Sequence, residues 1–174
     1  MYLFLPGNDK SNKQWCESLR DSFDEKDKLM FFYNHWIGGG NIDWNTELDK
    51  IIGLKIHGKT YVIGKSAGCI LGLKAQKLGY IDVDAYVFIG FPYYWALNRG
   101  DEVDYLLESL KTKSLFIQKP KDPVIGYKEL ETILKAKALN VKTLQYKRPG
   151  ERDNSHSYQD IIYLNKEIEV FFNS

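Results

Sequence analysis

The chain has 174 residues, of which 44% are hydrophobic and 27% are charged, and its formal net charge is +1. This length allows one domain with a sizeable core, and a charge near zero does not favour nucleic acid or an anionic membrane as a partner. No apolar run approaches the roughly 18 residues that span a bilayer, and the start of the chain lacks the basic segment of a signal peptide. We therefore expect a single cytoplasmic domain over residues 1–174.

The first half of the chain alternates continuous apolar runs with helical patterns. The runs at 2–6, 28–36 and 60–64 predict buried strands. Apolar residues spaced by three and four predict helices over 11–25, 43–54 and 66–78. Cys16 and Cys69 fall in two of these helices and form no metal-binding pattern with the histidines, so we expect buried, reduced thiols.

The same alternation continues through the second half of the chain. Strands are predicted at 84–90, 114–118 and 141–146, and helices at 101–110, 126–139 and from about 158 to 172. Six strands alternating with helices predict an α/β fold, with a mostly parallel six-stranded sheet covered by helices on both faces. Sites in such sheets form at the carboxyl ends of the strands, so the loops that follow each strand are the place to look.

The most informative stretch is Gly64-Lys65-Ser66-Ala67-Gly68, which joins the predicted strand 60–64 to a helix. A phosphate-binding loop is one interpretation, because lysine and serine follow a glycine. That motif needs four residues between its two glycines, whereas five separate Gly58 from Gly64. These five include the strand itself, where backbone N–H groups cannot turn towards a phosphate. A nucleotide- or flavin-binding protein is therefore disfavoured.

The alternative interpretation is Gly-x-Ser-x-Gly, a serine at a sharp strand-to-helix turn. With this motif and order of elements, the chain resembles the α/β-hydrolase superfamily over nearly its whole length. The resemblance implies an α/β-hydrolase fold in which Ser66 is the nucleophile and its neighbours Gly64, Ala67 and Gly68 are small because the turn is crowded. Lys65 occupies a position that tolerates larger residues, and we expect its charge to be solvated.

The resemblance also implies the order serine, acid, histidine along the chain. Asp122 follows the fifth predicted strand and His156 follows the sixth, so both are expected at the edge that carries Ser66. Asp101 and Asp153 are the rival acids. We expect Asp122 to orient His156, and His156 to serve as the base.

Two other histidines, His35 and His57, precede Ser66 and so violate this order. His35 ends the predicted strand 28–36, where it can line the site, but we expect a packed, hydrogen-bonded role for it. The family's oxyanion hole uses backbone N–H groups, here those of Ala67 and, by resemblance, Asn8, with Gly7 permitting close approach.

These residues predict a serine hydrolase that cleaves a small carboxylic ester, a small-molecule acyl substrate, through an acyl-enzyme. No metal or organic cofactor is expected. A thioester or peptide substrate is an alternative, and so is a non-catalytic binding protein with this fold. Larger family members insert a lid after the fourth strand, where this chain has only a short aromatic segment. Its Phe91, Tyr93, Tyr94 and Trp95 either line the site or cover the edge of the sheet.

Overall fold

A computed structural model describes residues 1–56 and 58–174. Its six strands form one sheet in the order β2-β1-β3-β4-β5-β6, and every neighbouring pair is parallel. The strands are β1 (Tyr2–Leu5), β2 (Lys28–Met30), β3 (Thr60–Lys65), β4 (Val83–Ile89), β5 (Lys113–Gln118) and β6 (Lys142–Gln145). The predicted α/β class and six-stranded sheet are confirmed, and the sheet is parallel throughout.

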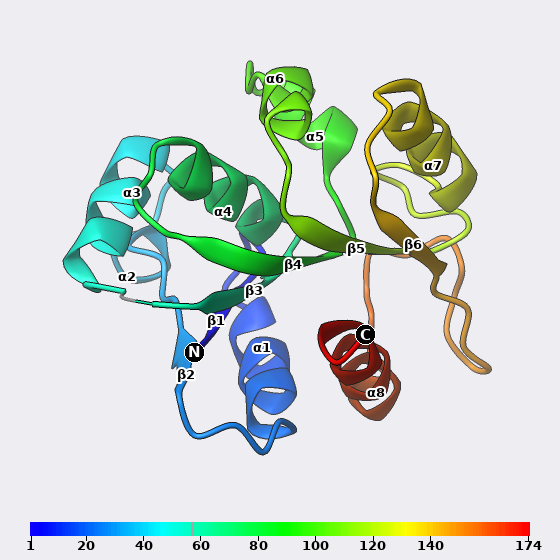
Figure 1. Ribbon diagram of the computed structural model, residues 1–174, viewed down its shortest axis with the longest axis horizontal. Helices are drawn as coiled ribbons and strands as arrows, with labels where there is room; N and C mark the ends of the chain where they lie inside the picture. The colour runs from blue at the N-terminus through cyan, green and yellow to red at the C-terminus, as the bar shows by residue number, and fades with distance from the viewer. Residues whose placement is uncertain (57) are drawn as a thin grey trace.

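Helices cover both faces of the sheet, because parallel strands need crossover connections (Figure 1). The helices are α1 (Asn12–Asp21), α2 (His35–Gly38), α3 (Trp44–Gly53), α4 (Ala67–Lys77), α5 (Tyr93–Asn98), α6 (Val103–Glu108), α7 (Tyr127–Ala136) and α8 (Ile161–Phe172). α1 and α8 contact each other on one face, and α3, α4, α6 and α7 cover the other.

Several predicted elements have different limits in the structure. The apolar run 28–36 forms a strand only over Lys28–Met30, and the rest is an irregular segment that leads into α2. Phe31 and Tyr33 are nevertheless buried, so the run is apolar because it enters the core and not because it is extended. The aromatic segment 91–100 contains helix α5, and the last helix begins at Ile161, not near 158.

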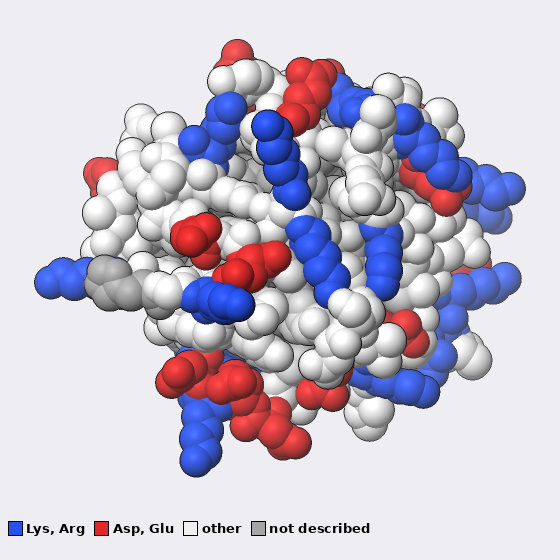
Figure 2. All heavy atoms as spheres, in the orientation of Figure 1, with Lys and Arg blue, Asp and Glu red and all other residues white. Residues whose placement is uncertain are grey.

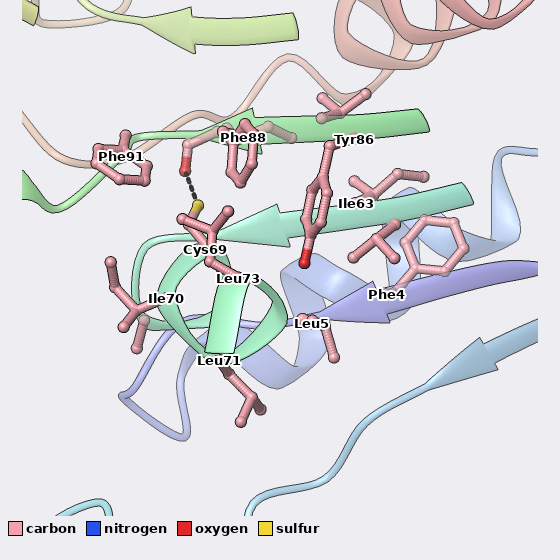
Figure 3. Close-up of a cluster of buried hydrophobic side chains, with 14 of the residues drawn as sticks. Phe4, Leu5, Ile63, Cys69, Ile70, Leu71, Leu73, Tyr86, Phe88 and Phe91 are labelled. Carbon is pink, nitrogen blue, oxygen red and sulfur yellow. Dashed lines mark hydrogen bonds between the residues drawn. The ribbon is translucent and has the colours of Figure 1, made fainter. Parts of the chain in front are cut away.

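The core packs between α4 and the central strands (Figure 3). Tyr86 and Phe88 of β4 stack with their ring centroids 4.4 Å apart, and Phe88 stacks on Phe116 of β5 at the same distance. Cys69 of α4 is fully buried beside them, and Cys16 is 2% exposed. Both cysteines are free, and burial raises the pKa of the Cys16 thiol to about 12. The expectation of buried, reduced thiols is confirmed.

Charged side chains of both signs are interspersed over the face shown in Figure 2. No single-sign stripe crosses this face, in keeping with the formal net charge of +1. Among the helices of the described residues, none combines the length and the apolar character needed to cross a bilayer.

Candidate active site

Ser66 lies at a sharp turn between β3 and α4. Its backbone is strained, with φ 50° and ψ −120°, a region that non-glycine residues rarely adopt. Gly68 shows why the neighbours are small, since a Cβ atom there would lie 2.0 Å from the carbonyl oxygen of Leu5. The end of β1 therefore packs directly against the start of α4, and the turn raises Ser66 at the carboxyl edge of the sheet.

A backbone hydrogen bond fixes this turn relative to the neighbouring strand β4. The Ser66 N–H donates to the Ile89 carbonyl at the end of β4, over 3.0 Å. Ala67 is the first residue of α4, so its N–H has no acceptor within the helix. That N–H also has no acceptor elsewhere in the described part of the chain. The positive end of the α4 dipole therefore points towards the space beside Ser66, where negative charge is stabilised.

Asp122 and His156 meet at the same edge of the sheet. The loop after β5 carries Asp122 and the loop after β6 carries His156, and Nδ1 of the imidazole lies 2.9 Å and 2.8 Å from the two carboxylate oxygens. Asp122 also accepts from the Val124 N–H, over 3.0 Å, and from the Tyr158 hydroxyl, over 2.8 Å. A carboxylate that accepts these bonds also accepts from Nδ1, which places the proton on Nδ1 and the lone pair on Nε2.

The Nε2 atom of His156 is buried and has no hydrogen-bond partner among the described residues. The imidazole packs on Gly90, which follows β4 with φ 60°, and a Cβ atom at Gly90 would lie 2.8 Å from His156 Cε1. His156 thus packs beside the Ile89–Gly90 peptide, whose carbonyl binds the Ser66 N–H. Ser66 and His156 share this neighbour, although no hydrogen bond joins their side chains. Such bonds are often long before substrate binds.

Gly90 and Tyr158 are site residues that the sequence interpretation missed. Tyr158 is fully buried, and its hydroxyl accepts from the Lys119 N–H at 3.1 Å while donating to Asp122. Burial, and then the charge of Asp122, raise the pKa of Tyr158 well above its ordinary value, so the hydroxyl keeps its proton. Tyr158 lies two residues after His156, and this proximity in sequence could have suggested a place in the site. Its hydrogen-bond partner Asp122, however, lies 36 residues away in the sequence.

A buried lysine braces the loop that carries His156. Lys119 is 1% exposed, and its ammonium group lies 2.9 Å from Glu151 Oε2. It also donates to the Arg152 carbonyl at 2.9 Å and to Ser155 Oγ at 3.2 Å. Since a buried ammonium group must be paired, these three bonds hold the loop against the end of β5.

The rival acids do not reach His156. Asp101 forms an ion pair with Lys74, with 2.9 Å between nitrogen and oxygen. The Asp153 carbonyl accepts from the Lys121 N–H, and its carboxylate bonds to no described residue. His35 has neighbours at both ring nitrogens, in line with the packed role expected for it. The remaining histidine, His57, lies outside the described residues.

Asn8 lies in the loop after β1, which approaches the start of α4. A Cβ atom at Gly68 would lie 2.7 Å from the Pro6 carbonyl oxygen of this loop. The Asn8 N–H bonds to no described residue, whereas its carbonyl accepts from His35 and Trp36. The N–H groups of both Asn8 and Ala67 therefore have no hydrogen-bond partner among the described residues.

Lys65 does not have the solvated charge expected from the sequence. It is 7% exposed, it donates to the Asn12 side chain, and its ammonium group lies 5.3 Å from the centre of the Trp15 ring. Burial lowers the pKa of Lys65. Because the group is enclosed under α1, its place beside Ser66 in sequence does not make it a free cation for substrate.

The aromatic side chains of the segment after β4 differ in how deeply they are buried. Phe91 is fully buried and Tyr93 is 7% exposed, and the Phe91 ring packs on Phe88 and Phe116. Tyr94 is 40% exposed, and its hydroxyl bonds to Glu129 of α7. Phe91 is thus packing that covers the sheet, whereas the Tyr93 hydroxyl bonds to Asp104 of α6, and no separate lid domain follows β4 among the described residues.

Solved structures with the same arrangement of elements include an esterase and other hydrolases. Est1E from Butyrivibrio proteoclasticus, solved with ferulic acid bound, has a TM-score of 0.71 at 11% identity, over 99% of this chain and 87% of that one. Alpha/beta hydrolase domain-containing protein 10 from mouse has a TM-score of 0.65 at 15% identity, over 99% and 89%. E-2-(acetamidomethylene)succinate hydrolase has a TM-score of 0.66 at 13% identity, over 100% and 91%.

No protein-family model matches the sequence, and a search of curated proteins finds no match. Identities between 11% and 15% establish the fold alone. The chain has the α/β-hydrolase fold, as its resemblance to that superfamily predicted.

Proposed function

We propose that the protein is a serine hydrolase that cleaves small carboxylic esters, with Ser66 as nucleophile, His156 as base and Asp122 as the acid that orients it. The observation that carries this proposal is the state of His156. Its Nδ1 proton is held by a buried carboxylate, its Nε2 has no partner among the described residues, and its imidazole packs beside the peptide that binds Ser66. A base needs an available lone pair at that place.

The proposed reaction has two acyl-transfer steps. Ser66 Oγ attacks the ester carbonyl as its proton passes to His156 Nε2, and the N–H groups of Asn8 and Ala67 bind the oxyanion. The intermediate collapses when the alkoxide leaves and takes the proton from Nε2. Water then attacks the acyl-enzyme, with Nε2 again accepting the proton, and the carboxylic acid is released. Asp122 stabilises the imidazolium that forms in each step.

The substrate class follows from the short segment between β4 and α6. Helix α5 has six residues, and Phe91 before it packs on the sheet, so this segment builds no separate lid among the described residues. An open site of this kind favours a small acyl group. Ester, thioester and peptide substrates with matched acyl groups distinguish the three bond types, and we expect the ester to react fastest because it is the most easily cleaved by this machinery.

Ser66→Ala tests the proposal with a panel of short-chain p-nitrophenyl esters. We expect the variant to lose roughly 10⁴- to 10⁶-fold in kcat, because no other group takes the place of the nucleophile. Ser157→Ala is the matched control, since Ser157 is exposed and adjacent to His156 in sequence. Wild-type protein that is folded but no more active than Ser66→Ala would instead favour the non-catalytic alternative.

Tyr158→Phe tests whether the Tyr158 hydroxyl positions Asp122. Removing this bond to a charged group is expected to lower kcat about tenfold. KM is expected to change little, because the Tyr158 hydroxyl contacts Asp122 and not the substrate. Tyr86→Phe is the control, because Tyr86 is also fully buried but its hydroxyl bonds to no described residue. A loss of kcat in Tyr158→Phe no larger than in the control would show that the tyrosine only fills space.

A further inference from the structure

The carbonyl group of Asn8 accepts two side-chain hydrogen bonds. His35 Nε2 and Trp36 Nε1 each lie 2.8 Å from the Asn8 oxygen. A carbonyl oxygen has two lone pairs, so its capacity is filled. Since this oxygen can only accept, the His35 proton is on Nε2. Neither bond is part of a strand or a helix, so both act on the loop that carries Asn8.

A buried carboxylate lies beside His35 and binds the backbone next to it. Glu47 is 1% exposed, and its Oε1 atom lies 3.4 Å from His35 Nδ1. The same carboxylate accepts from the Asn34 N–H, at 2.9 Å and 3.1 Å for its two oxygens. Burying a carboxylate on α3 is costly unless it is paired. Glu47 thereby ties the segment that carries His35 and Trp36 to a helix of the scaffold.

The Asn8 N–H belongs to the Gly7–Asn8 peptide. Side-chain hydrogen bonds fix the peptides before and after this one. The Tyr33 hydroxyl donates to the Pro6 carbonyl over 2.8 Å, which fixes the peptide before it. His35 and Trp36 bind the Asn8 carbonyl, which fixes the peptide after it. Because peptide groups are planar, fixing both neighbours sets the direction of the N–H between them.

We propose that His35 and Trp36 are positioning residues that aim the Asn8 N–H at the oxyanion, and that Glu47 holds the segment that carries them by accepting from the Asn34 N–H. This inference rests on the proposed hydrolase function. His35 is not a second base, because its Nε2 proton is committed to a carbonyl. The arrangement makes the loop after β2 part of the active-site scaffold, although none of its side chains touches substrate in the proposed reaction.

The test uses substitutions that remove donors and keep volume. Trp36→Phe removes one donor, and the double variant His35→Leu/Trp36→Phe removes both, whereas His35→Gln keeps an N–H donor near the Nε2 position. We expect Trp36→Phe to lower kcat several-fold and the double variant to approach the roughly hundredfold loss of a missing oxyanion donor. KM is expected to change little, and His35→Gln should retain more activity than His35→Leu.

Binding of a boronic acid, which forms a tetrahedral adduct with an active serine, gives a second readout. Affinity for this transition-state mimic should fall in parallel with kcat, whereas affinity for the carboxylic acid product should not. Trp44→Phe is the control, since Trp44 packs on Trp95 away from this loop. Thermal midpoints identify any variant whose loss comes from unfolding.

The outcomes separate the two proposals. Unchanged kcat and boronate affinity in the folded double variant, in an enzyme whose activity depends on Ser66, overturn the positioning role alone. A loss confined to KM or to thermal stability overturns it as well. If wild-type activity does not depend on Ser66, the hydrolase proposal fails, and the positioning role fails with it.

Discussion

Asp122→Asn is expected to lower kcat by about 10⁴-fold while leaving the protein folded. The asparagine amide presents an N–H group to His156 Nδ1, where the carboxylate now accepts. The imidazole is then favoured in the tautomer whose proton lies on Nε2, which cannot take a proton from Ser66. The imidazolium that forms in each step also loses its counter-charge. Both effects act on the rate and not on the packing, because the two side chains have the same shape.

Asp153→Asn is the matched control for this substitution. Asp153 is in the same loop as His156, but its carboxylate bonds to no described residue. We expect its kcat to be close to that of the wild type, and circular dichroism should show both variants folded. Equal activities for Asp122→Asn and the wild type would remove Asp122 from the mechanism, and a large loss in Asp153→Asn would favour the rival acid.

Gly68→Ala is expected to destabilise the protein by about 3 kcal/mol, because overpacking against rigid atoms costs this order of free energy. The new Cβ atom would lie 2.0 Å from the Leu5 carbonyl oxygen and 2.7 Å from that of Pro6. These are backbone atoms at the end of β1, so β1 and α4 must separate. The free energy of unfolding in urea measures the loss. The loop that carries Asn8 must move as well, so the folded fraction should hydrolyse esters poorly.

Gly53→Ala is the control for the glycine substitution. Gly53 ends α3 and is exposed, and a Cβ atom added there would meet no neighbouring atom within 4 Å. Since alanine favours a helix over glycine, this change should leave the stability equal or raise it by about 0.5 kcal/mol. If Gly68→Ala proved as stable as Gly53→Ala, the close approach of β1 to α4 would be refuted.

The order of strands and helices could be predicted because it depends on local patterns. Continuous apolar runs, which are typical of buried strands, alternate with stretches whose apolar residues have helical spacing. The strand before Ser66 and the helix after it are both found. Chain order then placed Asp122 and His156 in loops at one edge of the sheet. Their hydrogen bond agrees with that placement. Local patterns therefore carry the fold and the main outline of the candidate site.

The contacts that complete the site join residues far apart in the sequence. Tyr158 bonds to Asp122, and Lys119 bonds to Glu151, across separations of 36 and 32 residues. The charge of Lys65 was expected to be solvated, because nothing in its own stretch shows that α1 covers it. The apolar run 28–36 was interpreted as one strand, because burial of Phe31 and Tyr33 in an irregular segment has the same composition as a strand.

The two described histidines illustrate what the structure adds. Each lies near a buried carboxylate, Asp122 for His156 and Glu47 for His35. Only the structure shows that the other nitrogen of His35 is used by a carbonyl, whereas that of His156 has no partner among the described residues. This difference supports His156 rather than His35 as the proposed base, independently of chain order.

The central claim is that Ser66 is an activated nucleophile, and a fluorophosphonate probe tests it most directly. Such probes bond covalently to a serine only when its neighbours activate it. We predict that purified wild-type protein gains the mass of one phosphonyl group, that peptide mapping places the group on Ser66, and that Ser66→Ala gains none. Folded wild-type protein that stays unlabelled, or that is labelled equally in Ser66→Ala, would contradict the account.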